Sequence, residues 1–489
     1  MTRLWKIPVL ASLLCSGCTI GPRYQRPVTQ TPAALKGMAG NDQWKMAAPS
    51  DGLLKGKWWE IFGDPQLNRL EESVNIDNQN VQQAEAQFRQ ARALVLASRA
   101  NYYPSIGSNP AISQSYEEKR ANHSFSLPAP ATWEPDLWGR VRLSVENAVS
   151  NAQVSAADLE NIRLSQQALL ATDYFLLAAQ DMQSQVLSNT IETYEKNLQL
   201  AINRHTGGVA SKSDVTLAQT QLAAARAQST ETRIARAQAE HAIAMLTGQL
   251  PASLEIGASK IGAPPPPIPV GVPSQLLERR PDIAASERRV AAANASVGIA
   301  ETAYYPTLTL SASPGFLSTN LANLFTYAAR SWSAGPSLSQ TLFDFGRRGA
   351  ALENAEAAYD ATVAAYRQTV LSAFQEVEDD LASLRYLAEE AVQEQEAVLA
   401  SQEALSLEMD RYRAGTDSYL NVITTQIIAL GDQQTAITIL QRRMSAAVDL
   451  VKALGGGWDA STLPSGNALR SVALADPKNT HNVARPAGK

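Results

Sequence analysis

Two long stretches of this chain, residues 140–206 and 350–414, contain neither glycine nor proline. Because these residues most often interrupt helices, each stretch predicts one continuous helix. A helix of roughly 65 residues is roughly 100 Å long, far more than a globular core needs. Alanine is abundant, and apolar residues recur at three- to four-residue or heptad-like spacing, which predicts coiled-coil packing. The helix sequences alone fit equally well a simple antiparallel coiled-coil hairpin that is surrounded by solvent.

The two stretches belong to an internal repeat. The segment DLWGR, which ends at Arg140, recurs 207 positions later as FDFGR, which ends at Arg347. At the same offset, RHTGG ending at Gly208 matches RYRAG ending at Gly415, and LTG matches ALG. NYYPS recurs as AYYPT at an offset of 202. The chain is therefore predicted to contain two copies of one unit.

Each unit has the same order of predicted elements. A first helix, about residues 64–99 or 274–302, leads into a stretch with β character and then into the long helix. After a glycine turn, a helix of about 40 residues runs back toward Gly248 or Gly455. The predicted organisation is a signal peptide (1–17), an N-terminal segment (18–63), the first repeat (64–262), a proline-rich linker (263–273), the second repeat (274–457) and a partly disordered tail (458–489).

Four stretches have the two-residue alternation of half-buried strands: about residues 104–115, 123–134, 306–316 and 331–343. In the third stretch Leu308 and Leu310 share one face while Thr307 and Thr309 share the other. Tryptophan and tyrosine cluster at the ends of these stretches, as interfacial aromatic residues do in transmembrane β-barrels. Two prolines in the second stretch argue against an uninterrupted strand there.

Four strands leave two open edges, which a lipid environment does not satisfy. If the strands cross a membrane, several copies of the chain must complete one barrel. Two copies would give eight strands and a filled interior, whereas three would give twelve and a pore. A soluble four-stranded sheet between helical hairpins is the alternative.

The two cysteines of the chain, Cys15 and Cys18, lie three positions apart near its beginning. They follow a short basic region and a short apolar run, which together predict a secretory signal. The ending LCSGC resembles a bacterial lipoprotein signal, so we expect cleavage before Cys18 and lipidation of that residue. A plain secretory signal with a free thiol, or a Cys15–Cys18 disulfide, is the alternative.

Composition excludes several classes of function. The formal net charge of −5 does not favour a nucleic-acid partner. The four histidines are far apart in the sequence, and none has metal-ligand spacing. No phosphate-binding loop or nucleophile motif is present. The sequence therefore predicts no enzyme, no metal site and no cofactor.

The chain resembles the TolC-like outer-membrane efflux proteins, in the NodT-type lipoprotein branch that serves RND efflux pumps. The resemblance covers almost the whole chain after the predicted signal. It is carried by the lipidation motif at Cys18 followed by TIGPRYQRP, and by the segments WWEIFGDPQLNRLEE, YYP (twice), WEPDLWGRVR, ERRPDIAASERRVAAANASVGIA, LFDFGRR and RYRAGTDSYLNV.

The resemblance implies an α+β membrane protein that forms a homotrimer. Three chains would build a 12-stranded β-barrel in the outer membrane of a Gram-negative bacterium and an α-barrel that extends into the periplasm. The implied partners are a periplasmic adaptor protein and an inner-membrane pump of the RND type. The implied function is a passive, gated duct that exports small toxic compounds. A dedicated exporter of a metabolite, oligosaccharide or polypeptide, and a lipid-anchored scaffold that conducts nothing, remain as alternatives.

The resemblance also places a gate at the periplasmic tips of the helical hairpins, at the turns Gly207, Gly208 and Gly415. Family gate positions correspond here to Arg411, Tyr412 and Leu420. Asp214, at the tip of the first unit, is expected to pair with Arg411. Thr424 stands where relatives often carry a constricting ring of aspartates, so an acidic ring is in doubt in this chain.

Overall fold

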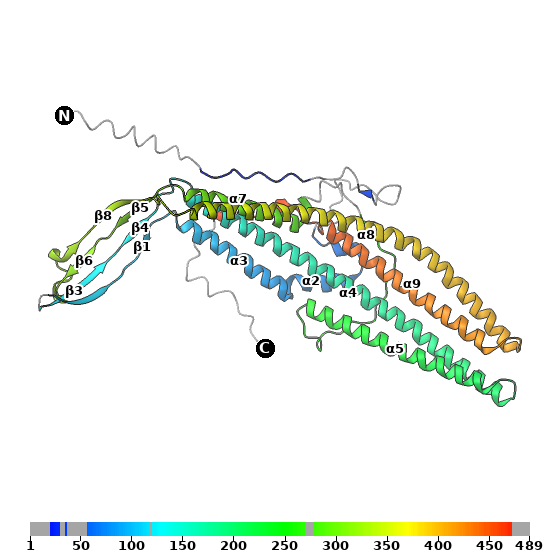
Figure 1. Ribbon diagram of the computed structural model, residues 1–489. Coiled ribbons are helices and arrows are strands. Elements are labelled where there is room, and N and C mark those ends of the chain that lie inside the picture. The colour runs from blue at the N-terminus through cyan, green and yellow to red at the C-terminus, as the bar shows by residue number, and fades with distance from the viewer. Residues whose placement is uncertain (1–19, 30–34, 37–55, 118–119, 269–277, 472–489) are drawn as a thin grey trace.

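The computed structural model describes residues 20–29, 35–36, 56–117, 120–268 and 278–471. The molecule is elongated, with β-strands at one end and two helical hairpins reaching to the other (Figure 1). The helices of the first repeat are α2 (Pro65–Asp77), α3 (Gln79–Ala100), α4 (Arg140–Thr206) and α5 (Lys212–Leu246). Those of the second are α7 (Pro281–Thr302), α8 (Arg347–Ala414) and α9 (Tyr419–Ala453). The described ranges also contain the short helices η3 (Trp58–Phe62), η4 (Leu321–Asn323), η5 (Tyr327–Ala329), η6 (Ala460–Thr462) and α10 (Gly466–Ser471).

The long helices α4 and α8 begin directly after the glycines at which the sequence predicted them. Gly139 and Gly346 have φ angles of 83° and 91°, a left-handed conformation that glycine adopts without a steric penalty. Asp64 caps α2 because its Oδ1 accepts hydrogen bonds from the backbone N–H groups of Gln66 (2.8 Å) and Leu67 (3.2 Å). The prediction of long paired helices is confirmed.

The predicted helix 64–99 is wrong in one respect, because Asn78 divides it into α2 and α3. Asn78 has an extended backbone, and its Nδ2 donates to the carbonyl oxygen of Leu246 at the end of α5 (2.8 Å). In the second repeat Arg280 precedes α7, and its Nη1 donates to the carbonyl oxygen of Ala453 at the end of α9 (3.0 Å). Different side chains thus fix the end of the returning helix in the two repeats. The predicted helix start at Ser274 lies outside the described residues.

Each of the four predicted strands is divided in two. The strands are β1 (Ser105–Ile106), β2 (Ala111–Glu117), β3 (Arg120–Pro128), β4 (Ala131–Trp133), β5 (Thr307–Ala312), β6 (Gly315–Ser318), β7 (Arg330–Ser331) and β8 (Ala334–Ser339). They form two antiparallel sheets, in the orders β1-β4-β5-β8 and β2-β3-β6-β7. Successive parts of each predicted strand therefore occupy equivalent places in the two sheets, and the four chain segments lie side by side.

Proline accounts for most of the interruption, since it cannot donate a hydrogen bond to a neighbouring strand. Pro130 and Pro314 stand at the breaks, yet their carbonyl oxygens accept hydrogen bonds from Gly107 (2.9 Å) and Ala129 (2.7 Å). Ser313 and Ser333 exchange two further backbone hydrogen bonds across the same level. The backbone ladder thus continues from one sheet to the other.

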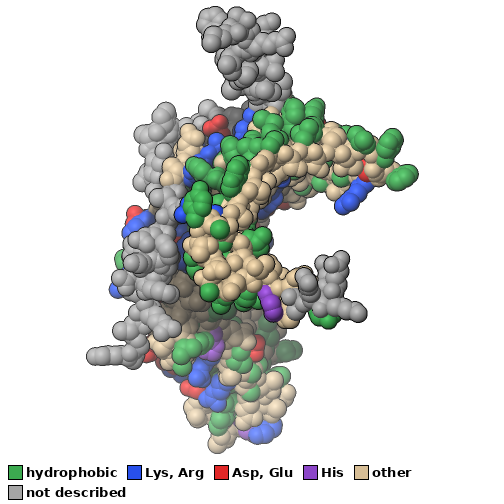
Figure 2. Space-filling model, turned by 90° about the vertical axis from the view of Figure 1, so that its left-hand side faces the viewer, with side chains coloured by type: hydrophobic (Ala, Val, Ile, Leu, Met, Phe, Trp, Pro, Cys, Tyr) green, Lys and Arg blue, Asp and Glu red, His purple; other side chains and the backbone are tan. Residues whose placement is uncertain are grey.

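Large apolar side chains of the strands are exposed in the single chain. Ile112 is 75% exposed, Trp332 79% and Leu338 68%. Figure 2 shows this end of the molecule, where hydrophobic side chains gather along the outer margin of a curved strip. Among the described helices, none combines the length and the apolar character needed to cross a membrane.

The largest buried cluster lies where the two repeats meet, near the middle of α4 and the end of α9. Trp58 and Trp59 of η3 are almost fully buried in it, together with Tyr174 of α4 and Leu381 of α8. Leu35 from the N-terminal segment also packs into this cluster. Short local elements are therefore stabilised by burial against the long helices.

The N-terminal residues 20–29 lie along α7 and α8. Tyr24 donates a hydrogen bond to Glu287, and Arg26 Nε donates to the hydroxyl of Tyr366 (3.3 Å). Gly21 packs against Gly298, where a Cβ on Gly21 would lie 3.1 Å from the Cα of that residue. These contacts hold the start of the described chain beside the last turns of α7, next to the strands.

Candidate functional site

The candidate site is the end of the molecule opposite the strands, where the turns of the two helical hairpins lie near each other (Figure 1). The α4–α5 turn contains Gly207 and Gly208, and the α8–α9 turn contains Gly415. Gly208 and Gly415 have φ angles of 75° and 80°, so both tight turns use a conformation that other residues rarely adopt. The predicted tip turns are therefore at the hairpin ends in the structure.

A small apolar cluster joins the two hairpins just behind the turns. It contains residues of all four helices: Ala201, Val215, Ala218, Met409, Tyr412, Tyr419, Val422 and Ile423. The rings of Tyr412 and Tyr419 are 5.0 Å apart, and each side chain is 2% exposed. The burial of these two rings among the apolar side chains of the cluster holds the two tips together within one chain.

Arg204, which the sequence reasoning did not select, makes the direct contact between the hairpins. Its guanidinium lies 4.7 Å from the centroid of the Tyr412 ring, a cation–π distance, and its Nη1 donates to the carbonyl oxygen of Arg413 (3.0 Å). Arg204 occupies the position in the first repeat that Arg411 occupies in the second. The repeat itself was the signal that could have identified it.

The hydroxyl of Tyr412 is buried and has no hydrogen-bond partner within the described part of the chain. Burial raises the pKa of this phenol, and the nearby carboxylate of Asp214 raises it further. Burial likewise raises the pKa of Tyr419 above its usual value. Both tyrosines are thus neutral at physiological pH, and the Tyr412 hydroxyl is available as a donor.

The expected pair between Arg411 and Asp214 does not form within the single chain, and the pairing stays a prediction. Arg411 Nη1 instead contacts Glu408 Oε1 (2.7 Å), one turn earlier on the same helix. Asp214 accepts a hydrogen bond from the Ser211 hydroxyl (2.8 Å), and its backbone N–H donates to that hydroxyl (3.2 Å). Asp214 is therefore held by the N-terminal cap of α5, which competes for the carboxylate.

Leu420 and Thr424 lie one turn apart on α9. The Leu420 side chain is 57% exposed, and the Thr424 hydroxyl donates to the Leu420 carbonyl oxygen (3.0 Å). Thr424 brings no charge to this face, in agreement with the sequence. The nearest preceding carboxylate on the turn, Asp417, accepts from Asn421 Nδ2 (2.6 Å), and its pKa is lowered mainly by the backbone N–H of Ser418.

Cys18, the predicted lipidation site, lies outside the described residues. Within the described ranges no group of three or more histidine, cysteine, aspartate or glutamate side chains has a metal-binding arrangement. The candidate site is an apolar contact between the two hairpins, with polar groups at its rim.

Comparison with known proteins identifies the family. The chain matches the outer membrane efflux protein family over residues 72–249 and 272–456. It is 29% identical over 492 residues to the antibiotic efflux pump outer membrane protein ArpC of Pseudomonas putida, covering 98% of this chain and 100% of that protein. It is 30% identical over 469 residues to the solvent efflux pump outer membrane protein SrpC of the same species, covering 93% and 98%.

A solved structure of the outer-membrane channel OprN superposes with a TM-score of 0.84 at 30% identity, covering 90% of this chain and all of that one. The chain therefore belongs to the outer membrane efflux protein family and is an outer-membrane channel component of an efflux pump.

Proposed function

We propose that this protein is the exit duct of a tripartite pump that expels small toxic compounds, such as antibiotics and solvents. The observation that carries the proposal is that two open four-stranded sheets with exposed apolar side chains continue into helices of 67 and 68 residues. Helices of that length extend roughly 100 Å, enough to pass from the outer membrane far into the periplasm. The names of ArpC and SrpC supply the class of compound.

The duct is a homotrimer in this proposal. Within one chain the end strands of the two sheets are β1 and β8, and β2 and β7. Their outer edges carry backbone groups that need partners in a lipid environment. Three copies joined edge to edge give a closed barrel of twelve strands, wide enough for a pore.

Lipid attachment at Cys18 anchors the duct in this proposal. Gly21 packs against Gly298, four residues before the end of α7 at Thr302. The first described residues therefore lie beside the end of α7 that leads into the strands, which supports a lipid anchor on this side of the molecule. The Cys18→Ser variant is expected to lack the lipid mass in intact-mass spectrometry while still forming the trimer.

The hairpin tips act as the gate. Arg204 and Tyr412 hold the two hairpins of one chain together, which leaves Arg411, on the outer turn of the second hairpin, facing the next copy around the ring. Asp214, Leu420 and Thr424 complete the rim. The periplasmic adaptor and an inner-membrane pump of the RND type supply the work of opening. The protein has a conducting role and no catalytic one in this proposal.

Deletion of the gene and its restoration in the same cells test the function. Accumulation of several unrelated dyes and antibiotics should rise on deletion and fall again on restoration. If accumulation stays unchanged while one secreted product disappears from the medium, the protein is a dedicated exporter. A purified trimer that conducts no ions in planar bilayers would support the scaffold alternative instead.

A further inference from the structure

One groove of the first repeat is filled by the chain itself. Arg236 of α5 contacts the carboxylates of Asp181 on α4 (2.6 Å) and Glu240 on α5 (3.2 Å). Its Nη2 also donates to the carbonyl oxygen of Ile256 (2.6 Å), in the extended segment that follows α5. Asp181 and Glu240 are 9% and 17% exposed, so this is a half-enclosed charge network with its partners in place.

The segment in this groove is held by its backbone and by apolar side chains. The Ile256 N–H donates to Glu240 Oε1 (2.7 Å), and the Ser259 N–H donates to Asp181 Oδ2 (3.0 Å). The Ile256 side chain is 3% exposed, and Leu254 and Ile261 pack against the same core. In the first repeat, the groove thus binds an extended segment by hydrogen bonds from one arginine and to two carboxylates, and by packing against an apolar surface.

The second repeat retains the arginine of this groove and lacks its partners. Arg443 of α9 is 207 positions after Arg236, but the counterparts of Asp181 and Glu240 are Ala388 and Ala447. Within the described part of the chain Arg443 makes no hydrogen bond or ion pair, and its Nε is buried. Burial lowers the pKa of its guanidinium. A desolvated cation without a counter-charge is costly, so the site favours an incoming anion.

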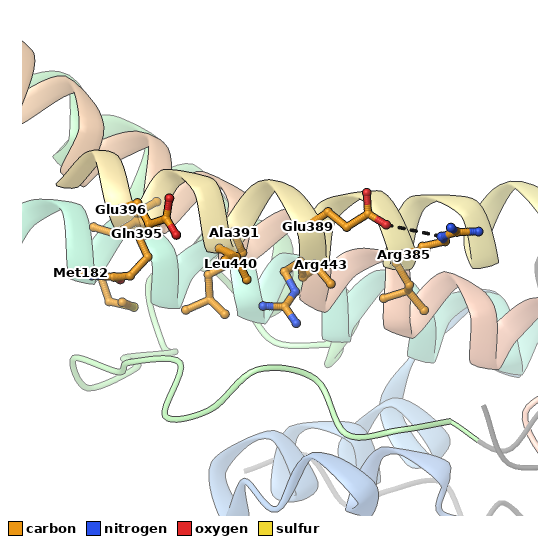
Figure 3. Close-up of a pocket in the computed structure, with 13 residues that line it drawn as sticks. Met182, Arg385, Glu389, Ala391, Gln395, Glu396, Leu440 and Arg443 are labelled. Carbon is orange, nitrogen blue, oxygen red and sulfur yellow. Dashed lines mark hydrogen bonds and ion pairs between the residues drawn. The ribbon is translucent and has the colours of Figure 1, made fainter. Parts of the chain in front are cut away.

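An open groove of about 1060 Å³ surrounds Arg443 (Figure 3). Its lining includes Ala388, the counterpart of Asp181, together with Met182 of α4 and Leu440 of α9. The carboxylate of Glu389 contacts Arg385 at one end (3.4 Å) and forms no ion pair with Arg443. Glu396 also lines the groove, at the end opposite Arg385, and does not pair with Arg443 within the described chain. Beside Arg443 the groove therefore offers an apolar floor and an unpaired cation, the complement of an extended peptide that carries a carboxylate.

We propose that this groove binds an extended, carboxylate-bearing segment of the periplasmic adaptor protein, with Arg443 as its anchor. The proposal rests on the function proposed above for the existence of that partner. The groove of the first repeat shows the mode of binding. There the segment after α5 crosses the hairpin, its backbone forms hydrogen bonds with side chains of α4 and α5, and its apolar side chains pack against the core. Because the helices of the second repeat supply no carboxylate at these positions, the partner must bring it.

The test uses the purified, full-length trimer in lipid nanodiscs and the purified adaptor of its pump. A photo-cross-linking amino acid replaces Val392, a 62% exposed residue of the groove lining. The expected result is a covalent adduct with the adaptor, with an acidic adaptor segment identified by mass spectrometry. Arg443→Ala should weaken the adduct at least about tenfold, because it removes the charge partner.

Two further variants separate the groove from general damage. Ala388→Asp places a carboxylate in the groove lining at the counterpart of Asp181, so Arg443 gains a partner within the chain and the adduct should again weaken at least about tenfold. Arg442→Ala is the matched control: Arg442 is the neighbouring arginine, more than half exposed and paired with Glu390 (3.6 Å), and its loss should leave the adduct unchanged.

Three outcomes would overturn the proposal: no adduct with the adaptor, an adduct only within the chain or with another copy of it, or an adduct that is insensitive to Arg443. Trimer migration and helical circular dichroism confirm that each variant is folded. Efflux by the wild-type protein in cells is measured separately. Normal efflux without the adduct refutes the groove alone, whereas absent efflux refutes the duct.

Discussion

Replacement of Arg204 by alanine should loosen the closed tip. The change removes the cation–π contact with Tyr412 at 4.7 Å and the hydrogen bond to the Arg413 carbonyl oxygen at 3.0 Å. A cation–π contact at a partly exposed site contributes about 0.5–2 kcal/mol. A hydrogen bond from a charged donor contributes about 1 kcal/mol or slightly more when it is exposed. The two contacts together stabilise the paired hairpins by about 1–3 kcal/mol in each chain.

Since about 1.4 kcal/mol corresponds to a factor of ten, the opening equilibrium should shift by about 5- to 150-fold per chain. Arg411→Ala should have a smaller effect on the contacts within a chain, because the Arg411 side chain is 60% exposed and its partner Glu408 is on the same helix. Such pairs contribute about 0.3–0.5 kcal/mol. If Arg411→Ala shifts the opening equilibrium by more than the Arg411–Glu408 pair accounts for, Arg411 also contacts another copy of the chain.

Single-channel recording of the purified trimer in planar bilayers measures the shift as the fraction of time spent in high-conductance states. Arg413→Ala is the control, since that variant keeps the carbonyl group that Arg204 uses and removes only an exposed pair with Asp410 (3.2 Å). Arg204→Lys keeps the charge but not the planar stacking, and should lie between wild type and alanine. Unchanged conductance in Arg204→Ala, with a large rise in Arg413→Ala, would refute the assignment.

Further predictions concern stability, measured by thermal unfolding of the detergent-solubilised protein. Arg236→Ala should destabilise the protein by about 2–4 kcal/mol, because it leaves buried carboxylates without a counter-charge. Arg443→Ala should leave stability unchanged or raise it, because that arginine has no counter-charge in the described chain. An equal loss of stability in the two variants would contradict this reasoning. Glu71 is fully buried without a hydrogen-bond partner in the described chain, and burial raises its pKa well above 4.5. The folded state therefore favours the protonated form of Glu71, so the contribution of this residue to the free energy of unfolding is greatest at acidic pH and is lost as the pH rises toward the folded-state pKa. Glu71→Gln should remove this dependence of stability on pH. If the dependence persists unchanged in the variant, it belongs to other groups. Gly455→Ala should destabilise the protein by roughly 3 kcal/mol or more, because the added Cβ would lie 2.0 Å from the Arg279 carbonyl oxygen and the backbone there has a φ of 92°. Gly431→Ala should stabilise the protein by roughly 0.5–1 kcal/mol, because this glycine lies within α9 and no heavy atom lies within 4 Å of the added Cβ.

The sequence predicted the helical part of the fold because glycine and proline act locally. The bounds of α4 and the end of α8 follow from Gly139, Gly207 and Gly415 without any knowledge of packing, whereas α8 begins at Arg347 and includes Gly349. The break at Asn78 was not predictable in this way. It depends on the carbonyl oxygen of Leu246, 168 residues away, which no local pattern encodes.

The site was predicted less completely, for the same physical reason. Glycine marked the turns, and the resemblance marked Arg411 and Tyr412. Within one chain a cap hydrogen bond from Ser211 holds Asp214, and Arg411 contacts Glu408 one turn away, so local hydrogen bonding decides where both side chains lie. The role of Arg204 depends on which hairpin lies beside it. That information is tertiary, although the 207-residue offset already paired Arg204 with Arg411.

The matched lengths of the hairpins limit how this chain can change over evolution. Helices α4 and α8 have 67 and 68 residues, and α5 and α9 have 35 each. A deletion of seven residues from each arm of one hairpin would shorten it by roughly 10 Å relative to the other. Six hairpins in a ring would then end at two heights, and three of them would lose their neighbours. Insertions and deletions in these helices should therefore be inherited in pairs, one in each repeat.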